Sequence, residues 1–180
     1  NRAVLAQRQP GSAFKAFVYL TAMDQGMTAA TTVEDKPLVR GSWAPQNAGG
    51  GWHGTVTLRT ALSKSYNIPA IRVALKVGTE NVLKMAKAAG ITTLVESGRY
   101  TDDNPAMALG GLTKGVTPLD MATAYGTIAA NGMYHKPVVI KKILDRNGKV
   151  LVTNRASYDL MLTNYVLFNG DDPNGSLLEL

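Results

Sequence analysis

The chain has 180 residues, of which 45% are hydrophobic and 18% charged, so it holds enough apolar material for a folded core of about one domain. It has no cysteine, which excludes disulfides, a thiol nucleophile and thiolate metal sites, and it shows neither a signal peptide nor a run of about 18 apolar residues. The net charge of +6 suits an acidic partner, but basic residues are spread along the chain without zinc-finger spacing or aromatic-basic alternation, so we expect no nucleic-acid binding.

The first predicted helix follows the turn Pro10-Gly11-Ser12. Apolar residues recur at helical spacing after this turn, and Gly26 ends the helix after about 14 residues. Residues 27–54 are rich in Gly, Pro, Thr and Asn, which predicts a long loop. Trp43 and Trp52 indicate that this loop is ordered, because such large aromatic side chains seldom stay unpacked.

A second helix is expected after Thr57, which can cap it. Pro69 is expected to hold Ile68 out of helical geometry, which places an exposed turn at residues 65–68. Three later helices are predicted: 69–77, then 79–89 capped by Thr79 and ended by Gly90, then one opened by Thr117-Pro118 and ended by Asn131-Gly132.

Strand signals come late in the chain. Residues 138–144 are rich in β-branched side chains, Asn147-Gly148 is a strong hairpin signal, and residues 150–152 return, so we expect a hairpin over about 138–152. Beyond it, residues 158–168 could form a helix, followed by turn-forming residues.

Ser12 and Lys15 form the pattern S-x-x-K in the first helical turn. Residues three apart share a helix face, and a lysine can deprotonate a serine if its own pKa is lowered. A helix N-terminus disfavours the ammonium form, so the unusual position of Lys15 fits a base that works partly neutral. The alternative is that Ser12 is an N-cap and Lys15 points into solvent.

Ser65, Tyr66 and Asn67 form a second pattern, S-x-N, in the predicted exposed turn. The order S-x-x-K followed by S-x-N is described for serine acyl transferases of the β-lactamase and penicillin-binding class. The alternative is that Ser65 and Asn67 only cap a helix end.

Longer segments extend the two motifs. They are RQPGSAFKAFVYL, WAPQN, GTVTLRTALSKSYNIPAIRVALKVG, ALGGLTKGVTPLDMATAYGTIAANG and KPVVIKKILDRNGKVL. In order and spacing they closely resemble the transpeptidase domain of the class A, bifunctional penicillin-binding proteins, from about residue 1 to 151. The resemblance implies an α+β fold of the β-lactamase and penicillin-binding type, present mostly as its helical part plus the late hairpin, with most of the central antiparallel sheet missing.

The resemblance also implies catalytic roles. Ser12 would be the nucleophile, acylated by a D-Ala-D-Ala stem peptide or a β-lactam, and Lys15 would be its base. Ser65 would relay a proton to the leaving amine, and Asn67 would bind Lys15 and the amide carbonyl of the substrate.

Four further residues complete the predicted substrate-binding set: Tyr66, Gly110, Gly111 and Trp43. The glycine pair would let backbone pass close to the site, or would simply form a tight turn. Trp43, with Pro45 and Asn47, matches the aromatic-x-Pro-x-Asn loop of the family, which we interpret as support for the site. No metal or organic cofactor is implied.

The chain departs from the family pattern in two places. Ala16 stands where proline usually follows the lysine, and no K-T-G or K-S-G occurs; Lys114-Gly115 lies in a different family segment. The third motif would supply the other oxyanion donor and bind the substrate carboxylate. We therefore expect residues 1–153 to be a partial transpeptidase domain and residues 154–180 to be a poorly matched tail.

The resemblance predicts a peptidoglycan D,D-transpeptidase outside the cytoplasmic membrane. It implies a parent protein that is membrane-anchored and carries a glycosyltransferase domain. The alternative is a non-catalytic module, or an inactive fragment, that binds cell-wall peptides or protein partners; the missing third motif favours it, whereas the joint presence of Ser12, Lys15, Ser65 and Asn67 disfavours it. Apolar faces that lack a covering sheet would favour self-association.

Overall fold

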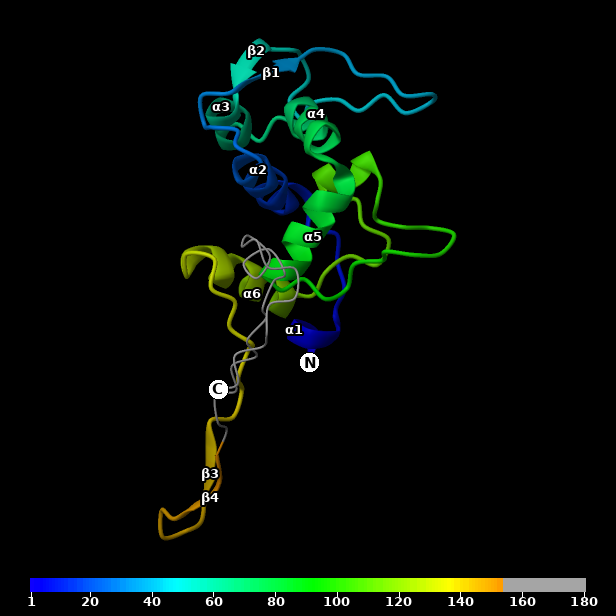
Figure 1. Ribbon diagram of the computed structural model, residues 1–180. Helices are drawn as coiled ribbons and strands as arrows, with labels where there is room; N and C mark the ends of the chain where they lie inside the picture. Colours follow the sequence, from blue (N-terminus) through cyan, green and yellow to red (C-terminus); the bar gives the residue numbers. More distant parts are fainter. Residues whose placement is uncertain (154–180) are drawn as a thin grey trace, which may run out of the picture. The chain divides into compact units, whose positions relative to one another are not determined.

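The computed structural model describes residues 1–153, which divide by their contacts into a unit of residues 1–137 and the beginning of a second unit at Val138. The first unit is mostly helical (Figure 1). Its helices and strands are α1 (Arg2–Leu5), η1 (Gly11–Phe14), α2 (Lys15–Asp24), β1 (Thr32–Asp35), β2 (Gly54–Thr57), α3 (Leu58–Ser63), α4 (Asn67–Val77), α5 (Thr79–Ala89), η2 (Pro105–Leu109) and α6 (Pro118–Ala129). None of the helices in residues 1–153 combines the length and apolarity that a bilayer crossing requires.

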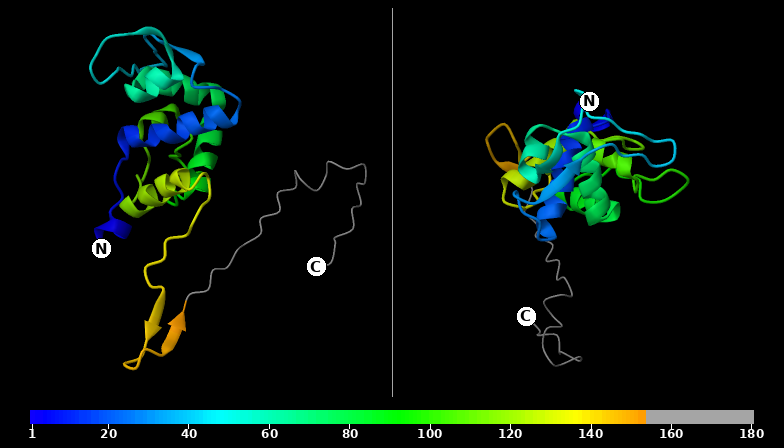
Figure 2. Two further views of the ribbon diagram at one scale, coloured as in Figure 1. Left: turned by 90° about the vertical axis from the view of Figure 1, so that its left-hand side faces the viewer. Right: turned by 90° about the horizontal axis from the view of Figure 1, so that it is seen from above.

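Helix α2 is the centre of this unit. It contacts α3, α4 and α5, and Figure 2 shows it crossing the middle of the helical layer. Phe14, at the end of η1, and Phe17, Val18 and Ala22 in α2 are fully buried, as expected for a helix that is apolar nearly all round. The sequence predicted one helix from the Ser12 turn, but the chain first makes a 3₁₀ turn at Gly11–Phe14 and becomes α-helical only at Lys15.

Helix α4 begins earlier than the sequence predicted. Asn67 and Ile68 are its first two residues, so the exposed turn does not extend to Ile68. Pro69 occupies the third position, where the missing N–H has no helical partner to lose, and the burial of Ile68 and Pro69 outweighs the preference of a pre-proline residue for extended geometry.

The predicted caps are partly confirmed. The hydroxyls of Thr57 and Thr117 accept the backbone N–H of Thr60 and Asp120, which caps α3 and α6. Thr79 is not a cap: Gly78 precedes α5 with φ of 90°, and the Thr79 hydroxyl donates to Asp103 instead. Gly90 ends α5 as expected.

Residues 27–54 are not entirely loop. Strand β1 pairs antiparallel with β2 in the register Thr32 to Thr57 and Asp35 to Gly54. The two strands are four residues each, and the pairing joins segments about twenty residues apart, so no local pattern predicted it. In Figure 1 this small sheet lies beside α3 and α4.

The described part of the second unit is the predicted hairpin. Strands β3 (Lys142–Leu144) and β4 (Val150–Thr153) pair antiparallel, and the Asp145 carboxylate accepts the backbone N–H of Asn147 and Lys149 in the turn. Residues 138–141, predicted as strand, lie before β3. The helix expected at 158–168 lies outside the described residues.

Candidate active site

The S-x-x-K pattern spans the junction of η1 and α2. Ser12 is exposed in the 3₁₀ turn, and its carbonyl accepts the backbone N–H of Lys15. Lys15 is fully buried, so the interpretation in which it points into solvent is wrong. Ser12 is not an N-cap either, because Pro10 precedes the turn in that position.

The buried Lys15 ammonium joins the two motifs. Lys15 Nζ donates to the Ser65 carbonyl at 2.6 Å, to Ser65 Oγ at 3.1 Å and to Asn67 Oδ1 at 2.7 Å. The S-x-N turn therefore lies directly against Lys15, although the two motifs are fifty residues apart. Among residues 1–153 no side-chain hydrogen bond involves the Ser12 hydroxyl, and the backbone of the 3₁₀ turn places Ser12 one helical turn from Lys15.

The conformation of Ser65 aims its oxygens at Lys15. Ser65 has a left-handed backbone with φ of 55°, which is uncommon for a residue other than glycine. Hydrogen bonds from Ser65 N to Leu62 O and from Tyr66 N to Ala61 O, both 2.9 Å, hold this turn at the end of α3. The local strain is of order 1 kcal/mol.

Burial lowers the pKa of Lys15 from 10.5 to about 8, because the desolvated ammonium is less stable than in water. An ammonium has three hydrogens and uses them on the three acceptors, whereas a neutral amine keeps two hydrogens and gains a lone pair. The two nearest acceptors, Ser65 O and Asn67 Oδ1, can accept the two hydrogens of the neutral Lys15 amine. Its lone pair is then free to accept a proton from a neighbouring hydroxyl.

A second segment holds the chain just before Ser12. Arg8 and Val116 exchange backbone hydrogen bonds of 2.9 and 2.8 Å, and the Gln9 side-chain amide pairs with both backbone groups of Leu112. Gly110, with φ of 75°, passes so close that a Cβ there would lie 2.4 Å from Gly11 N and O.

The two glycines of the predicted pair therefore have different surroundings. Gly110 allows the close backbone passage beside the Ser12 turn that the resemblance implied, and Gly111 lies against Ala106, where a Cβ would be 3.1 Å from the carbonyl oxygen. From α6, the Tyr125 hydroxyl donates to Ala13 O at 2.8 Å. The Ser12 turn is therefore held from both the residue 110–116 segment and α6.

The two aromatic residues of the predicted set lie differently. Tyr66 stacks on the His53 ring, with centroids 4.0 Å apart. Trp43 is half-buried against the core, and its backbone forms an isolated antiparallel β-bridge with Arg40. In residues 1–153 no hydrogen bond joins it to Lys15, Ser65 or Asn67. Its loop nevertheless reaches the site, because Gln46 O accepts from Asn67 Nδ2 at 2.7 Å.

Sequence reasoning missed Asp35 and His53, which lie behind the S-x-N turn. Neither belongs to a local motif, and nothing in the sequence distinguishes Asp35 from its acidic neighbour Glu34. Within residues 1–153 no group of three or more His, Cys, Asp and Glu side chains is placed to hold a metal ion.

Comparison with known proteins supports the same family from two directions. The family described as the penicillin-binding protein transpeptidase domain matches residues 1–162. Penicillin-binding protein 1A of Aquifex aeolicus is 42% identical over 160 residues, which cover 86% of this chain and 21% of that protein. The chain therefore spans about a fifth of the length of this curated relative.

Solved structures agree. Penicillin-binding protein 1A from Haemophilus influenzae matches with a TM-score of 0.74 and 30% identity over 86% of this chain and 23% of its own. The PonA1 protein from Mycobacterium tuberculosis, solved in complex with penicillin V, matches with a TM-score of 0.74 and 33% identity over 82% of this chain and 42% of its own. The predicted fold class is confirmed, as a helix-rich part with two small antiparallel sheets in the described residues.

Proposed function

Because the chain belongs to the penicillin-binding protein transpeptidase family, we propose that it carries the nucleophile half of a peptidoglycan D,D-transpeptidase site. The proposed substrate is a stem peptide ending in D-Ala-D-Ala, and a β-lactam would acylate the same serine. The penicillin V complex of the PonA1 protein supports the second ligand. We place the reaction outside the cytoplasmic membrane.

The single observation that carries this proposal is the environment of Lys15. A fully buried lysine, bonded to both polar residues of a distant turn and with a pKa near 8, is a neutral amine in part of the molecules near neutral pH, far more than an ordinary lysine. A base must have its pKa near the working pH to accept a proton and later release it.

In the proposed reaction Ser12 Oγ attacks the carbonyl carbon of the penultimate D-Ala while Lys15 takes the hydroxyl proton. The C–N bond then breaks while the proton held by Lys15 passes through the Ser65 hydroxyl to the departing amine. Free D-Ala leaves, and the rest of the stem peptide stays on Ser12 as an ester. An acceptor amine attacks this ester, which forms the cross-link and returns the proton to the serine. Asn67 would hold the Lys15 amine and the substrate amide.

The site as this chain holds it is half of the proposed machinery. The Ser12 backbone N–H would supply one oxyanion donor. The chain has no K-T-G or K-S-G to supply the second donor and the carboxylate contact, and we propose that they come from a longer, membrane-anchored parent with a glycosyltransferase domain.

The proposal is tested by incubating the chain with a fluorescent penicillin and measuring its intact mass. We expect one covalent adduct per chain, and none for Ser12→Ala, because the ester forms on the Ser12 oxygen. Circular dichroism of both samples shows that they are folded. A well-folded chain that never forms an adduct would contradict acylation by this chain.

The rate of adduct formation should also depend on pH. Only neutral Lys15 can accept the Ser12 proton, so the acylation rate should rise with pH around a midpoint near 8 and then level off. Stopped reactions across this range, separated by gel and read by fluorescence, measure the profile. A rate that is flat through pH 8 would exclude Lys15 as the base.

A further inference from the structure

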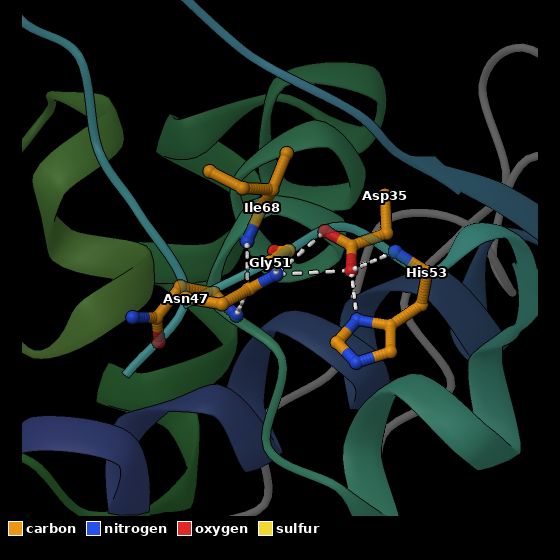
Figure 3. Close-up of polar contacts among 6 residues, drawn as sticks. Asp35, Asn47, Gly51, His53 and Ile68 are labelled. Atoms are coloured by element: carbon orange, nitrogen blue, oxygen red, sulfur yellow. Dashed lines mark hydrogen bonds and ion pairs between the residues drawn. The ribbon is translucent and has the colours of Figure 1, made fainter. Parts of the chain in front are cut away.

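A buried carboxylate lies behind the proposed site, at the end of β1. The Asp35 side chain is completely inaccessible, and it accepts four hydrogen bonds (Figure 3). Asn47 Nδ2 lies 2.9 Å from both of its oxygens, and His53 donates to Oδ2 from its backbone N–H at 3.1 Å and from Nδ1 at 2.6 Å. A buried charge so fully bonded orients its partners, since any other arrangement leaves it unsatisfied.

The first set of contacts runs from Asp35 through Asn47 to α4. Asp35 and the Gly51 carbonyl occupy the Asn47 amide nitrogen, so Asn47 Oδ1 must face the other way. There it accepts the backbone N–H of Asn67 at 2.8 Å and of Ile68 at 3.4 Å, as Figure 3 shows for Ile68.

These are the first two amides of α4, whose own N-cap residue provides no side-chain bond. Asn47 therefore caps the helix from twenty residues away. The cap fixes the residue whose Oδ1 binds Lys15.

The second set of contacts runs through His53 to Tyr66. A carboxylate only accepts, so His53 Nδ1 carries the hydrogen that faces Asp35. This bond sets the plane of the ring, on which Tyr66 stacks with an interplanar angle of 14°. The middle and last residues of the S-x-N turn are thus held by the same carboxylate.

We infer that Asp35 is a positioning residue that holds the S-x-N turn in place beside Lys15, by fixing Tyr66 through His53 and Asn67 through Asn47. The catalytic consequence rests on the proposed transpeptidase function, while the positioning itself does not. Asp35 touches none of the reacting atoms and acts only through these neighbours.

The test replaces Asp35→Asn and follows amide hydrogen exchange by NMR. Asparagine has one accepting oxygen and two N–H donors, so at least one donor now bound by Asp35 loses its acceptor. We expect exchange at the Asn67 N–H to accelerate by about tenfold relative to amides in α6, as for a weakened helix cap. The matched control is Glu34→Gln, an exposed acid on the opposite face of β1, which should leave the Asn67 exchange unchanged.

A double variant, Asp35→Asn with Asn47→Asp, keeps the inference falsifiable if the single variant fails to fold. The amide introduced at position 35 can donate to the carboxylate introduced at position 47, which can accept from Asn67 and Ile68, so slow exchange should return. A folded single variant with unchanged Asn67 exchange would overturn the inference. So would a folded double variant in which Asn67 exchanges as fast as in the single variant. If the single variant does not fold, a folded double variant in which Asn67 exchanges about tenfold faster than in the unchanged chain would overturn it.

Acylation by fluorescent penicillin is measured on the same samples. We expect a slower rate but unchanged final stoichiometry for Asp35→Asn, with the rate restored in the double variant. An unchanged chain that forms no adduct contradicts the proposed function alone, because the exchange data still decide the positioning role.

Discussion

At Lys15 burial and charge oppose each other within one side chain. The first turn of a helix is a poor place for an ammonium, and complete burial adds desolvation, which lowers the pKa to about 8. The acceptors of Ser65 and Asn67 limit this penalty but do not abolish it. In the unfolded chain the lysine would titrate near its ordinary value of 10.5.

The first prediction concerns stability and pH. Between pH 8 and 10.5 the unfolded chain binds more protons at this lysine than the native chain, so native stability should rise with pH across this window. Relative to Lys15→Met, the free energy of unfolding of the unchanged chain should increase by up to about 3 kcal/mol. Urea unfolding of both proteins at several pH values measures it. A difference that stays constant with pH would mean that Lys15 has an ordinary pKa.

At the scale of elements, the site depends on how closely the end of η2 approaches η1. Gly110 adopts a left-handed conformation directly against Gly11, one residue before the proposed nucleophile. Gly111 has no such backbone requirement and only moderate crowding. The two glycines look alike in the sequence and differ in what the fold demands of them.

The second prediction follows from this difference. Gly110→Ala should lower the free energy of unfolding by about 2 kcal/mol or more, because the Cβ meets backbone that cannot move aside and φ is strained. Gly111→Ala is the matched control and should lower it by about 1 kcal/mol or less. Chemical unfolding followed by circular dichroism compares them. Equal losses would mean that the close approach to Gly11 is unimportant.

At the scale of the whole helical unit, some apolar surface is not covered by any of the residues that the structure describes. A hollow of about 300 Å³ is lined by side chains of α2, α5 and α6, including Leu20, Met85 and Ile128. Another, of about 320 Å³, lies beside Tyr19, whose buried hydroxyl has no hydrogen-bond partner among residues 1–153. Contiguous apolar surface of this kind favours association in water. Self-association of the chain therefore stays a prediction, and these two hollows are the surface through which we expect it.

The third prediction tests that surface. The chain should associate increasingly with concentration in sedimentation velocity, and Met85→Lys should weaken the association because it places a charge in the hollow. Glu80→Gln alters the net charge equally on the same helix, away from the hollow, and should leave association unchanged. A chain that remains monomeric at all concentrations would contradict the prediction.

The order of helices, and several of their ends, could be predicted from the sequence because local chemistry decides them. Thr57 and Thr117 cap helices with their own hydroxyls, and the late hairpin turns where Gly148 has a φ of 79° and Asp145 accepts the backbone N–H of Asn147 and Lys149. Local rules failed where packing outweighed them: at Ile68 before Pro69, at Thr79, and at β1, which needs a partner strand distant in sequence.

By itself the sequence determined which chemical groups are present, their spacing within each motif and, through long matching segments, the family. The tertiary structure alone decided that Lys15 is buried against Ser65 and Asn67, that Gly110 passes Gly11, and that Asp35 stands behind the S-x-N turn. The physical reason is the distance along the chain over which each kind of interaction acts. Capping and turn preferences act within a few residues, whereas desolvation and hydrogen bonding at the site depend on side chains that only the packed core brings together.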